Sequence, residues 1–459
     1  MAKVVLIGAG LAGSLLAIYL AKRGIEVEVY EARPDMRKVK ISAGRSINLA
    51  LSDRGIAALR EVGLDEYMLQ EAIPMYGRMV HTLDGKTKFL AYSGRQGEYI
   101  NSVSRAGLNR ALMNRAEEFP NVKIFFNHRC KAFDCETGEA LIEDITRGCE
   151  IKVKGDTLIA TDGAGSAVRN SMLHGCIPRF NFSQSWLEHG YKELHIPPGK
   201  NGEFLMEKNA LHIWARHSFM MIALPNPDGS FTCTLFLAHE GQENSFEQLK
   251  DADSLIKFFA KYFPDALPLM PTLIEDFFSN PTGNLGTIRC FPWNVAGKAL
   301  LLGDAAHAIV PFYGQGMNCA FEDCRILNLL IEEHGYDWQK VFQIFGKMRK
   351  PNTDAIADMA EENFYEMRDA VADPVFQRKR ELETKLEQLF PDYFSKYSMV
   401  TFREDLPYLV AKQRGNAQDK LLMEICSEIE DVSQIDLNEV MQKIREFNQQ
   451  FADIYPENK

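Results

Sequence analysis

Long hydrophobic runs, clustered cysteines and an excess of basic residues are all missing from this sequence of 459 residues. No stretch approaches the roughly 20 apolar residues of a membrane-spanning helix, so no membrane anchor is expected. The nine cysteines lack metal-ligand spacing, which favours reduced thiols and no metal. The formal net charge of −11 argues against a nucleic-acid partner, because phosphate binding needs clustered Lys and Arg. The first strand begins almost at once, leaving no room for a signal peptide, and a cytoplasmic protein is expected.

What remains is an ordinary globular composition, with 46% hydrophobic and 25% charged residues. A chain of this length is large enough for two interlocked domains. No internal repeat or low-complexity segment marks a boundary, so the boundaries come from changes in pattern. The composition leaves the oligomeric state open.

A glycine-rich turn follows the first predicted strand. Residues 3–7 have the pattern of a buried parallel strand, and residues 11–22 have helical spacing that ends before Gly24. Gly8 allows the tight turn, Gly10 allows close approach of a pyrophosphate, and Gly13 allows close packing of helix and strand. The next strand, residues 26–31, ends in Glu31, whose carboxylate can accept hydrogen bonds from ribose hydroxyls. This context predicts a dinucleotide site, although a glycine-rich turn without a ligand is the alternative.

Two more acidic turns follow far along the chain. Asp162-Gly163 comes after a predicted strand at residues 156–160, and Gly303-Asp304 comes after a buried strand at residues 298–302. Such spacing indicates a long ligand held at both ends, and FAD is the ligand that fits. Asp304 is then placed to bind the ribityl hydroxyls of the flavin.

A predicted helix begins near Met317, after the segment 311–316. Its first backbone N–H groups, at Gly316, Met317 and Asn318, are suited to stabilise negative charge on a reduced flavin ring. A capped surface helix is the alternative interpretation. We expect His307 to order its loop rather than act as a base, because the sequence offers it no matched Ser or Cys. Roles for Tyr313 and Gln315 stay open.

The fold class is therefore α/β. We predict a Rossmann-like FAD-binding domain, interleaved with an antiparallel-sheet substrate domain and followed by a helical C-terminal region. The period-two strands at residues 211–214 and 232–237, with a turn at 227–229, indicate the antiparallel sheet. The predicted boundaries are residues 1–175 and 285–350 for the FAD-binding domain, 176–284 for the substrate domain and 351–459 for the helical region.

The chain resembles the flavin-dependent aromatic hydroxylases that are similar to para-hydroxybenzoate hydroxylase. More narrowly, several strings look like those of the kynurenine 3-monooxygenase family: residues 44–51, 190–194, 211–214, 308–312, 315–318 and 397–402. The resemblance covers nearly the whole chain, and these strings are more specific than the nucleotide motifs.

The resemblance implies two sets of site residues. The FAD contacts would be Ala12, Tyr30, Glu31, Ala32, Arg33, Ala50, Arg105, the backbone of Cys130, Asp162, Asp304, Met317 and Asn318. The substrate contacts would be Arg78, Tyr92, Phe236, Phe312, Asn363, Glu366, Met367 and Tyr397. The implied reaction is hydroxylation of L-kynurenine to 3-hydroxykynurenine by dioxygen, through a flavin C4a-hydroperoxide, with NADPH as reductant. The choice of NADPH over NADH rests on the resemblance alone.

The residue chemistry can be compared with that substrate. Kynurenine has an α-carboxylate, an α-ammonium and an aniline ring, so its site needs a cation, an acceptor and an apolar slot. Arg78 lies among apolar neighbours, where a bidentate carboxylate would compensate its burial. Asn363, Glu366 and Met367 share one face of a predicted helix with Met359. Alternatives are a protein salt bridge for Arg78, a solvated helix edge for Asn363 and Glu366, and core packing for Tyr92 and Tyr397.

No acid–base residue is needed, because the aniline activates its own ring and the protein only has to position it. Three other functions stay possible from the sequence: a hydroxylase of the same fold that acts on another aromatic acid, a flavin-dependent halogenase or reductase, and a flavin-bearing binding protein. The halogenase carries a Trp-x-Trp string, which this sequence lacks.

Overall fold

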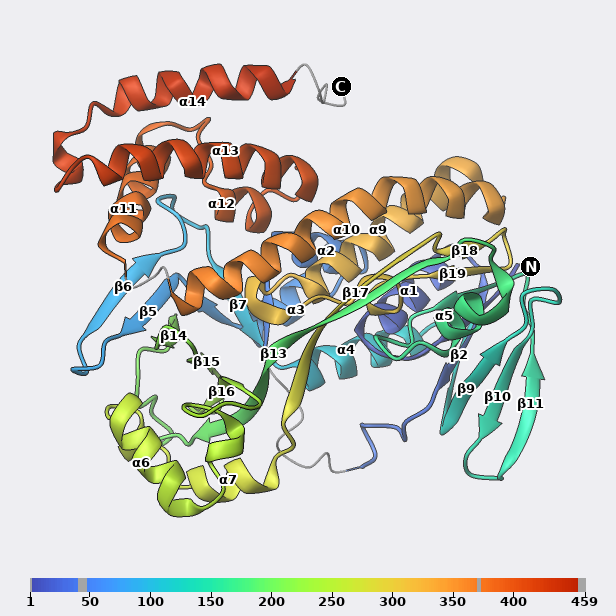
Figure 1. The fold of residues 1–459 in the computed structure, drawn as a ribbon. Helices are drawn as coiled ribbons and strands as arrows, with labels where there is room; N and C mark the ends of the chain where they lie inside the picture. The colour runs from blue at the N-terminus through green and yellow to red at the C-terminus, as the bar shows by residue number, and fades with distance from the viewer. Residues whose placement is uncertain (1, 40–47, 370–372, 453–459) are drawn as a thin grey trace. The chain divides into compact units, whose positions relative to one another are not determined.

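The computed structural model describes residues 2–39, 48–369 and 373–452, and the chain forms two compact units. The first unit comprises residues 1–70, 103–186 and 286–360, and the second comprises 71–102, 187–285 and 361–459. The chain thus passes between them five times, twice within long strands and once within a long helix (Figure 1). Four residues of the family-like string at 44–51, namely 44–47, lie outside the described residues.

A six-stranded sheet forms the centre of the first unit, in the order β18-β19-β12-β1-β2-β8. The pairs from β19 to β8 are parallel, and only β18 runs antiparallel. The strands are β1 (Lys3–Ile7), β2 (Glu26–Glu31), β8 (Val122–Phe126), β12 (Thr157–Ala160), β18 (Asn294–Val295) and β19 (Ala299–Leu301). The central residues of β1, β12 and β19 are buried, as expected for a parallel sheet with continuous apolar runs, whereas β8 at the sheet edge is partly exposed.

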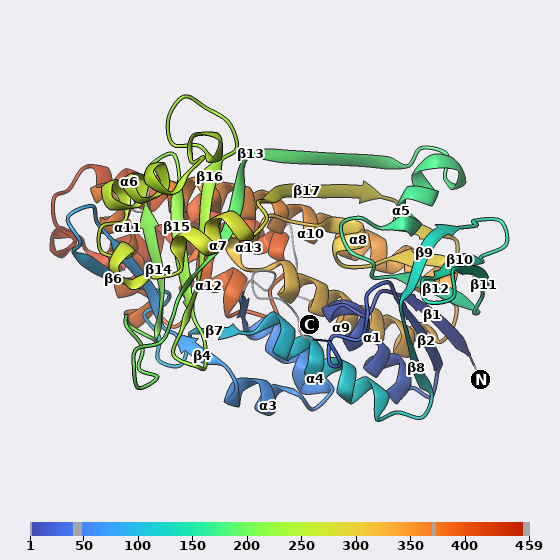
Figure 2. The same ribbon diagram turned by 90° about the horizontal axis from the view of Figure 1, so that it is seen from below.

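Helices cover this sheet, and Figure 2 shows α1, α4 and α9 side by side next to it. The helices of the unit are α1 (Leu11–Lys22), α2 (Asp53–Glu61), α3 (Asp65–Gln70), α4 (Arg105–Glu117), α5 (Ala167–Ser171), α8 (Asp304–His307), α9 (Gly316–His334) and the first part of α10 (Trp338–Arg368). The predicted bounds of the first helix are confirmed, and Gly24 follows it with a φ of +75°.

Smaller elements complete the first unit. The strands β9 (His128–Phe133), β10 (Ala140–Asp144) and β11 (Cys149–Val153) form a separate antiparallel sheet. The unit also contains the short strand β3 (Leu49–Leu51), the π-helical turn η1 (Met172–Cys176) and the 3₁₀ turn η4 (Pro311–Tyr313).

A seven-stranded sheet forms the centre of the second unit, in the order β17-β13-β16-β15-β14-β5-β6. Its strands are β5 (Gly77–His81), β6 (Thr87–Ala91), β13 (Asn181–Ile196), β14 (Ala210–Ala215), β15 (Met220–Pro225), β16 (Phe231–Ala238) and β17 (Gly283–Phe291). The predicted antiparallel pairing is present, but β5 and β14 pair in parallel. That pair joins segments more than 120 residues apart, which the alternation of side chains does not reveal.

Two groups of helices accompany this sheet. The helices α6 (Ala252–Tyr262) and α7 (Leu273–Ser279) form an apolar core with β13 to β16. At the C-terminal end, α11 (Pro374–Leu389), α12 (Lys396–Thr401), α13 (Tyr408–Ser427) and α14 (Leu437–Ala452) pack on one another (Figure 1). The remaining elements are β4 (Ile73–Met75), β7 (Ile100–Val103) and the 3₁₀ turns η2 (Phe246–Gln248), η3 (Leu267–Leu269) and η6 (Val432–Gln434).

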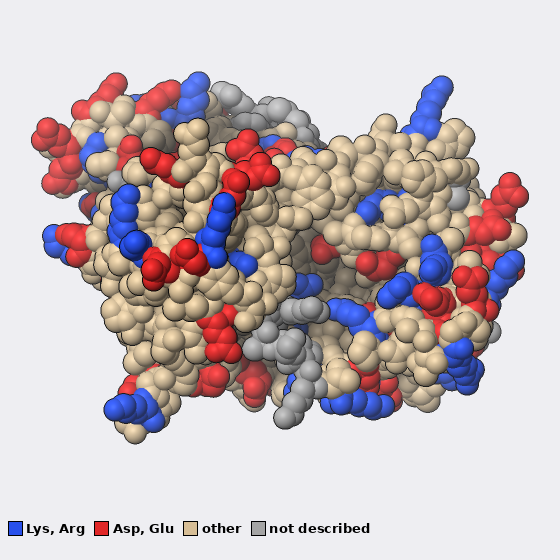
Figure 3. Space-filling view, turned by 60° about the horizontal axis from the view of Figure 1, so that its bottom comes forward, with Lys and Arg blue, Asp and Glu red and all other residues tan. Residues whose placement is uncertain are grey.

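Three further findings bear on the sequence expectations. Seven cysteines are free thiols, but Cys135 is disulfide-bonded, so the expectation of reduced thiols throughout is wrong at that residue. Within the described part of the chain, no helix has the length and apolarity to cross a bilayer. On the face shown in Figure 3, acidic and basic side chains are interspersed.

Candidate functional site

The turn after β1 is tight, and its glycines are required by their surroundings. Gly8 has a φ of +99°, and its N–H donates to the Tyr30 carbonyl at 2.8 Å. A Cβ on Gly13 would lie 2.0 Å from the Gly8 carbonyl oxygen, so only glycine lets α1 start this close to β1. A Cβ on Gly10, in contrast, would meet no described atom within 4 Å. The turn is therefore open at Gly10, where a pyrophosphate has room to approach the backbone.

Glu31 lies at the end of β2, beside this turn, and is almost fully buried. Its carboxylate accepts from the Ala9 N–H at 2.8 Å and from the Arg33 N–H and Nε at 2.9 and 2.8 Å. Burial opposes ionisation, but the Arg33 hydrogen bonds and charge lower the pKa of Glu31. An ionised acceptor at this position fits the ribose of an adenosine half.

The turn after β12 is tied directly to the first turn. Thr161 Oγ1 donates to the carbonyls of Ile7 and Gly8, both at 2.9 Å. The neighbouring Asp162 accepts from the Ala167 N–H through Oδ2, whereas its buried Oδ1 has no hydrogen-bond partner among the described residues. Burial raises the pKa of Asp162. A ligand hydroxyl or water at Oδ1 would satisfy this acceptor.

Asp304 follows β19 and begins the short helix α8. Its side chain is exposed to solvent, although protein surrounds it closely enough that desolvation raises the pKa of its carboxyl group. The Arg105 charge acts in the opposite direction. A recessed carboxylate that still reaches solvent is suited to receive ligand hydroxyls, as the predicted ribityl contact requires.

The start of α9 is held by the Asn318 side chain. Its Nδ2 donates to the carbonyls of Ala50 and Gly314, both at 2.8 Å, and its Oδ1 accepts from the Ser52 N–H at 3.0 Å. The Asn318 side chain thus fixes two neighbouring loops. Asn318 can therefore contact a flavin only through its backbone. Met317 and Gly316, also predicted to contact FAD, lie in the same first turn.

The remaining predicted FAD contacts also lie in the first unit. Tyr30 stacks on Phe125 at 4.9 Å, and Ala12 lies in the first turn of α1. Ala32 and Arg33 follow β2. Cys130 lies on β9, where burial raises the pKa of its thiol to about 12. No observation tests these contacts individually, and they stay predictions.

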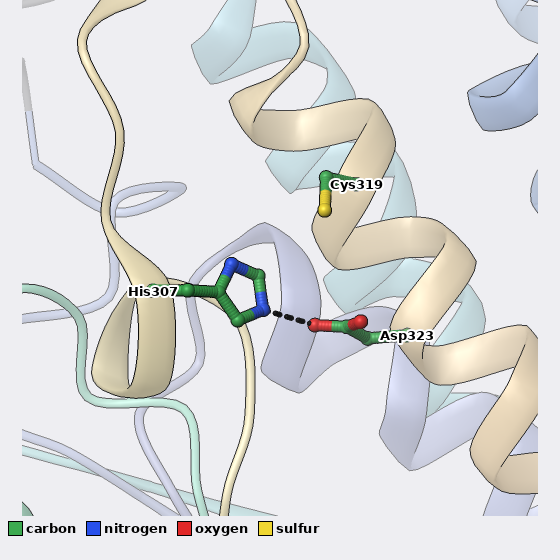
Figure 4. Close-up of side chains that lie close together, drawn as sticks. All are labelled: His307, Cys319 and Asp323. Atoms are coloured by element: carbon green, nitrogen blue, oxygen red, sulfur yellow. Dashed lines mark hydrogen bonds and ion pairs between the residues drawn. The ribbon is translucent and has the colours of Figure 1, made fainter. Parts of the chain in front are cut away.

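His307 joins a buried group with Cys319 and Asp323 (Figure 4). The ligand-type atoms of the three residues lie within 4.8 Å of one another. A metal ion does not fit there, because Arg349 donates to Asp323 at 2.7 Å and its Nη2 lies 3.4 Å from the Cys319 sulfur. Burial also raises the pKa of the Cys319 thiol well above its ordinary value, whereas a metal ligand would be a thiolate. Tyr313 and Gln315, to which the sequence assigned no role, are both buried. Gln315 Nε2 donates to Ser52 Oγ at 3.5 Å, and Tyr313 lies in η4.

The second unit brings Arg78 to a buried cluster of aromatic and acidic side chains. Arg78 is 7% exposed on β5, and its Nη1 pairs with Glu366 of α10 at 3.3 Å. Its guanidinium lies 5.4 Å from the Tyr397 ring centroid and 5.9 Å from that of Tyr92. Among the described residues, Arg78 Nε has no hydrogen-bond partner. Burial disfavours the charge, but Glu366 keeps the Arg78 pKa above its ordinary value.

Tyr92 and Tyr397 stack on each other with ring centroids 4.9 Å apart. Tyr92 is buried and Tyr397 is half-buried, and desolvation raises both pKa values, so both phenols keep their protons and can donate. The Tyr92 hydroxyl is buried without a hydrogen-bond partner among the described residues. Together with Arg78, they form a set of donors that suits a carboxylate.

The other predicted substrate residues are buried as well. Asn363 and Met367 lie on α10 one turn apart, with Asn363 Nδ2 3.3 Å from the Met367 sulfur. Phe236 lies on β16 in the same unit. Phe312 lies in η4 and belongs to the first unit, whereas the other seven predicted substrate residues belong to the second unit.

Sequence reasoning missed Arg380, which supports the Tyr92 segment from α11. Its Nη2 donates to the carbonyls of Ala91 and Tyr92 at 3.2 and 3.4 Å, and its Nη1 donates to Glu383 at 2.6 Å. In the sequence it is one of several basic residues in a charged helix, so no local signal distinguishes it.

Comparisons with known proteins identify the family of the chain. The model of the FAD binding domain family matches residues 1–194 and 289–335. The kynurenine 3-monooxygenase of Myxococcus xanthus is 47% identical over 443 residues, which are 96% of this chain and 94% of that protein. The kynurenine 3-monooxygenase of Dictyostelium discoideum is 44% identical over 97% of this chain and 98% of its own.

Solved structures show the same fold at lower identity. The tetrameric form of 2-methyl-3-hydroxypyridine-5-carboxylic acid oxygenase has a TM-score of 0.65 at 20% identity, covering 82% of this chain and 96% of that one. P. aeruginosa PqsL in complex with 2-aminobenzoylacetate has a TM-score of 0.61 at 17% identity, covering 80% and 97%. The full-length identities above 40% decide the family: the chain belongs to the kynurenine 3-monooxygenases.

Proposed function

We propose that this chain is an FAD-dependent, NADPH-consuming monooxygenase that hydroxylates L-kynurenine to 3-hydroxykynurenine with dioxygen. The reaction belongs to the kynurenine pathway of tryptophan degradation, which leads to NAD biosynthesis. The observation that carries the substrate assignment is the buried Arg78 guanidinium, whose Nε has no hydrogen-bond partner among the described residues. A buried cation with an unused donor is costly unless a ligand completes it, and an α-carboxylate would do so.

The substrate's own charges match those of the cluster. Arg78 and Glu366 form an ion pair at 3.3 Å, longer than a strong charge-assisted hydrogen bond. Kynurenine is a zwitterion at its α-carbon, so its carboxylate can take Arg78 while its ammonium takes Glu366. This exchange of partners leaves the net charge of the site unchanged. Asn363, one turn before Glu366 on the same helix, is placed to help bind the ammonium.

Tyr92 and Tyr397 complete the carboxylate site in this proposal. Because burial raises both pKa values, the phenols keep their protons at neutral pH. The Tyr92 hydroxyl is the better candidate donor, since no described group accepts its hydrogen bond. Phe236 and Met367 are buried and apolar, which suits them to contact the aniline ring and exclude water. Phe312 joins them on the resemblance alone.

The first unit would hold FAD through the residues described above. Gly8, Gly10 and Gly13 would admit the pyrophosphate, Glu31 the ribose, and Asp162 and Asp304 the polar groups of the cofactor. Backbone N–H groups of Gly316, Met317 and Asn318 would face the flavin ring. When bound, FAD supplies the redox chemistry, with NADPH as its reductant, that lets dioxygen hydroxylate the ring. The protein needs no acid–base residue for that step, because the aniline amine activates its own ring.

Product analysis tests the proposal directly. The purified protein, with FAD, NADPH and ¹⁸O₂, is expected to convert L-kynurenine to 3-hydroxykynurenine that carries one ¹⁸O atom. Anthranilate and salicylate serve as matched aromatic acids without an α-ammonium, and NADH serves as the alternative reductant. Turnover of either acid in preference to L-kynurenine would favour the hydroxylase of another substrate. Bound FAD without NADPH oxidation by any of these compounds would favour a flavin-bearing binding protein.

The proposal includes a cytoplasmic location without a nucleic-acid partner. The net charge of −11 supports the absence of a nucleic-acid partner, and seven free thiols support the location, against the disulfide at Cys135. Fractionation of the source cells, with the activity followed in each fraction, tests the location. Activity confined to the membrane fraction would contradict it.

A further inference from the structure

A network of buried charges lies directly behind the Gly303–Asp304 turn and has no part in the proposed function so far. It contains Arg54 of α2, His307 of α8, Glu322 and Asp323 of α9, and Arg349 of α10, all at most 8% exposed. We infer that Asp323 is a positioning residue for the cofactor, which fixes the Gly303–Asp304 turn so that Asp304 can bind FAD. The inference rests on the proposed placement of the flavin chain at Asp304.

The Asp323 carboxylate has three donors around it. His307 Nε2 lies 2.6 Å from Oδ2, the Gly303 N–H donates to the same oxygen at 3.3 Å, and Arg349 Nε donates to Oδ1 at 2.7 Å. Figure 4 shows the His307 ring pointing at Asp323 across the gap between α8 and α9. Burial opposes ionisation, yet His307 and Arg349 hold the Asp323 pKa below its ordinary value. The residue is thus an ionised, fully buried acceptor.

These contacts enclose Asp304, the residue of this turn that the cofactor is proposed to touch. Gly303 precedes Asp304, and His307 is the last residue of the four-residue helix that Asp304 begins. Asp323 therefore holds both ends of a single turn, and the only exposed member of that turn is Asp304. A helix this short has too few internal hydrogen bonds to hold its own orientation. Its anchoring to α9 then sets where the Asp304 carboxylate points.

The backbone of the turn is also confined by its neighbours. Gly303 has a φ of +62° and a ψ of −140°, a conformation that favours glycine. A Cβ on it would lie 3.3 Å from the Ala320 Cβ of α9 and 3.6 Å from the Ala12 Cβ of α1. The turn is therefore closely packed between two helices that both carry proposed FAD contacts at their first turns. A shift of the turn would move Asp304 relative to both.

Glu322 provides a matched control for this role. It precedes Asp323 on the same helix, is also buried, and pairs with the same Arg349 as well as with Arg54 at 2.6 Å. Within the described contacts it has no hydrogen bond or ion pair to residues 303–307. Removing either charge leaves a buried arginine with one partner fewer, so both changes weaken the fold. Only the change at Asp323 releases the turn.

The experiment compares Asp323→Asn, Glu322→Gln and Asp304→Ala with the unchanged protein. FAD dissociation constants are measured by flavin fluorescence on the apoproteins, together with urea unfolding of the same apoproteins and visible circular dichroism of the bound flavin. We expect Asp323→Asn to weaken FAD binding about 10- to 100-fold, as for loss of charged hydrogen bonds. Its flavin dichroism should change. Glu322→Gln should lower the urea midpoint about as much as Asp323→Asn does. Its FAD dissociation constant should stay within about threefold of that of the unchanged protein, a difference too small for a lost charged hydrogen bond.

The outcomes separate this inference from the proposal on which it rests. If Asp304→Ala weakens FAD binding but Asp323→Asn affects it no more than Glu322→Gln does, Asp323 only stabilises the fold. If Asp304→Ala also has no effect, the placement of FAD at Asp304 is itself wrong. Should Asp323→Asn not fold, His307→Asn removes one anchor while leaving the Asp323–Arg349 pair intact. It is then expected to weaken FAD binding more than Glu322→Gln, and an equal or smaller effect would overturn the inference.

Discussion

The two units of this chain present their ligand groups in opposite ways. In the first unit the candidate FAD site consists largely of backbone: glycine turns after β1 and β19, the open side of Gly10, and the N–H groups at the start of α9. In the second unit the candidate kynurenine site consists of side chains from β5, β16, α10 and α12, together with Tyr92 after β6. Few backbone groups are involved there.

This difference decides what a sequence reveals about each site. Backbone recognition needs glycine at fixed positions next to a strand and a helix, so it leaves contiguous motifs. Side-chain recognition needs only that suitable residues meet in the fold, and Arg78, Glu366 and Tyr397 are more than 300 residues apart at their extremes. The first site could therefore be derived from residue patterns, whereas the second depended on a family resemblance.

The largest expected effect tests the side-chain site at Arg78. Arg78→Met keeps the stem and removes the charge that pairs with Glu366 at 3.3 Å. If Arg78 binds the α-carboxylate, kcat/KM for L-kynurenine should fall about 30-fold to several-hundred-fold. This fall corresponds to a loss of about 2 to 4 kcal/mol in transition-state binding free energy. Kynurenamine, which lacks the carboxylate, should be a poor substrate of the unchanged enzyme. Its kcat/KM should fall little further in the variant. Equal losses with both substrates would make Arg78 structural.

The next effect tests the acidic turn of the first unit. Asp304→Ala should weaken FAD binding by about 1.5 to 3 kcal/mol, the usual contribution of a charged hydrogen bond. The Kd from fluorescence titration of the apoprotein measures it, and Asp253→Ala, an exposed aspartate on α6, is the control. If the variant retained FAD but lost affinity for L-kynurenine, the division of labour between the units would be wrong.

A pH experiment distinguishes the cores of the two units. In the second unit His212 is buried, with its Nδ1 2.8 Å from His81 Nε2 and its Nε2 2.8 Å from the Glu207 carbonyl. Asp265 lies 2.6 Å from the other nitrogen of His81 and also accepts from Trp214. Burial lowers the His212 pKa from 6.5 to about 4, so the folded protein holds this ring neutral while the unfolded chain binds a proton.

Stability should therefore fall as the pH decreases through 6.5 towards 4, because the unfolded state gains the proton first. At pH 5 the loss relative to pH 7.5 amounts to about 2 kcal/mol from this group. Urea unfolding at both pH values, followed by circular dichroism, measures it, and release of FAD reports the first unit separately. His212→Gln should reduce the acid-induced loss. If the variant lost as much stability between pH 7.5 and pH 5 as the unchanged protein, His212 would not be the cause of the loss.

The smallest effect concerns Phe312, which the structure places in the first unit. Phe312→Ala should lower the amount of 3-hydroxykynurenine formed per NADPH oxidised a few-fold, because a less confined ring is hydroxylated less often. NADPH oxidation itself should change less. Phe278→Ala, at an exposed phenylalanine of α7, is the control. Unchanged coupling would remove Phe312 from the substrate site.

Much of the fold was predictable because its signals are local. The strands at residues 3–7 and 26–31 and the helix at 11–22 have the predicted bounds, since apolar runs and a glycine stop define them. The parallel pairing of β5 with β14 was not predictable, because it depends on a contact between distant segments. The disulfide at Cys135 was missed for a similar reason, as cysteine spacing does not report proximity in space.

The site shows the same limit. The alternative of a salt bridge for Arg78 holds in part, since Glu366 is its partner. The alternative of core packing for Tyr92 and Tyr397 also holds in part, since their rings stack on each other. Neither excludes a ligand role, because one donor of Arg78 and the Tyr92 hydroxyl stay unused among the described residues. Asp323 and Arg380 went unnoticed in the sequence, because a charge in a helix does not show whether it faces solvent or a buried turn.

The central claim is that FAD in the first unit and L-kynurenine in the second take part in one reaction. Stopped-flow measurement of flavin absorbance after anaerobic mixing with NADPH, with and without L-kynurenine, tests it most directly, followed by mixing with dioxygen and quantification of product. We predict faster flavin reduction when L-kynurenine is present, and one 3-hydroxykynurenine for each flavin reoxidised. A rate of reduction independent of L-kynurenine, with hydrogen peroxide as the sole product after oxygen is added, would contradict the account.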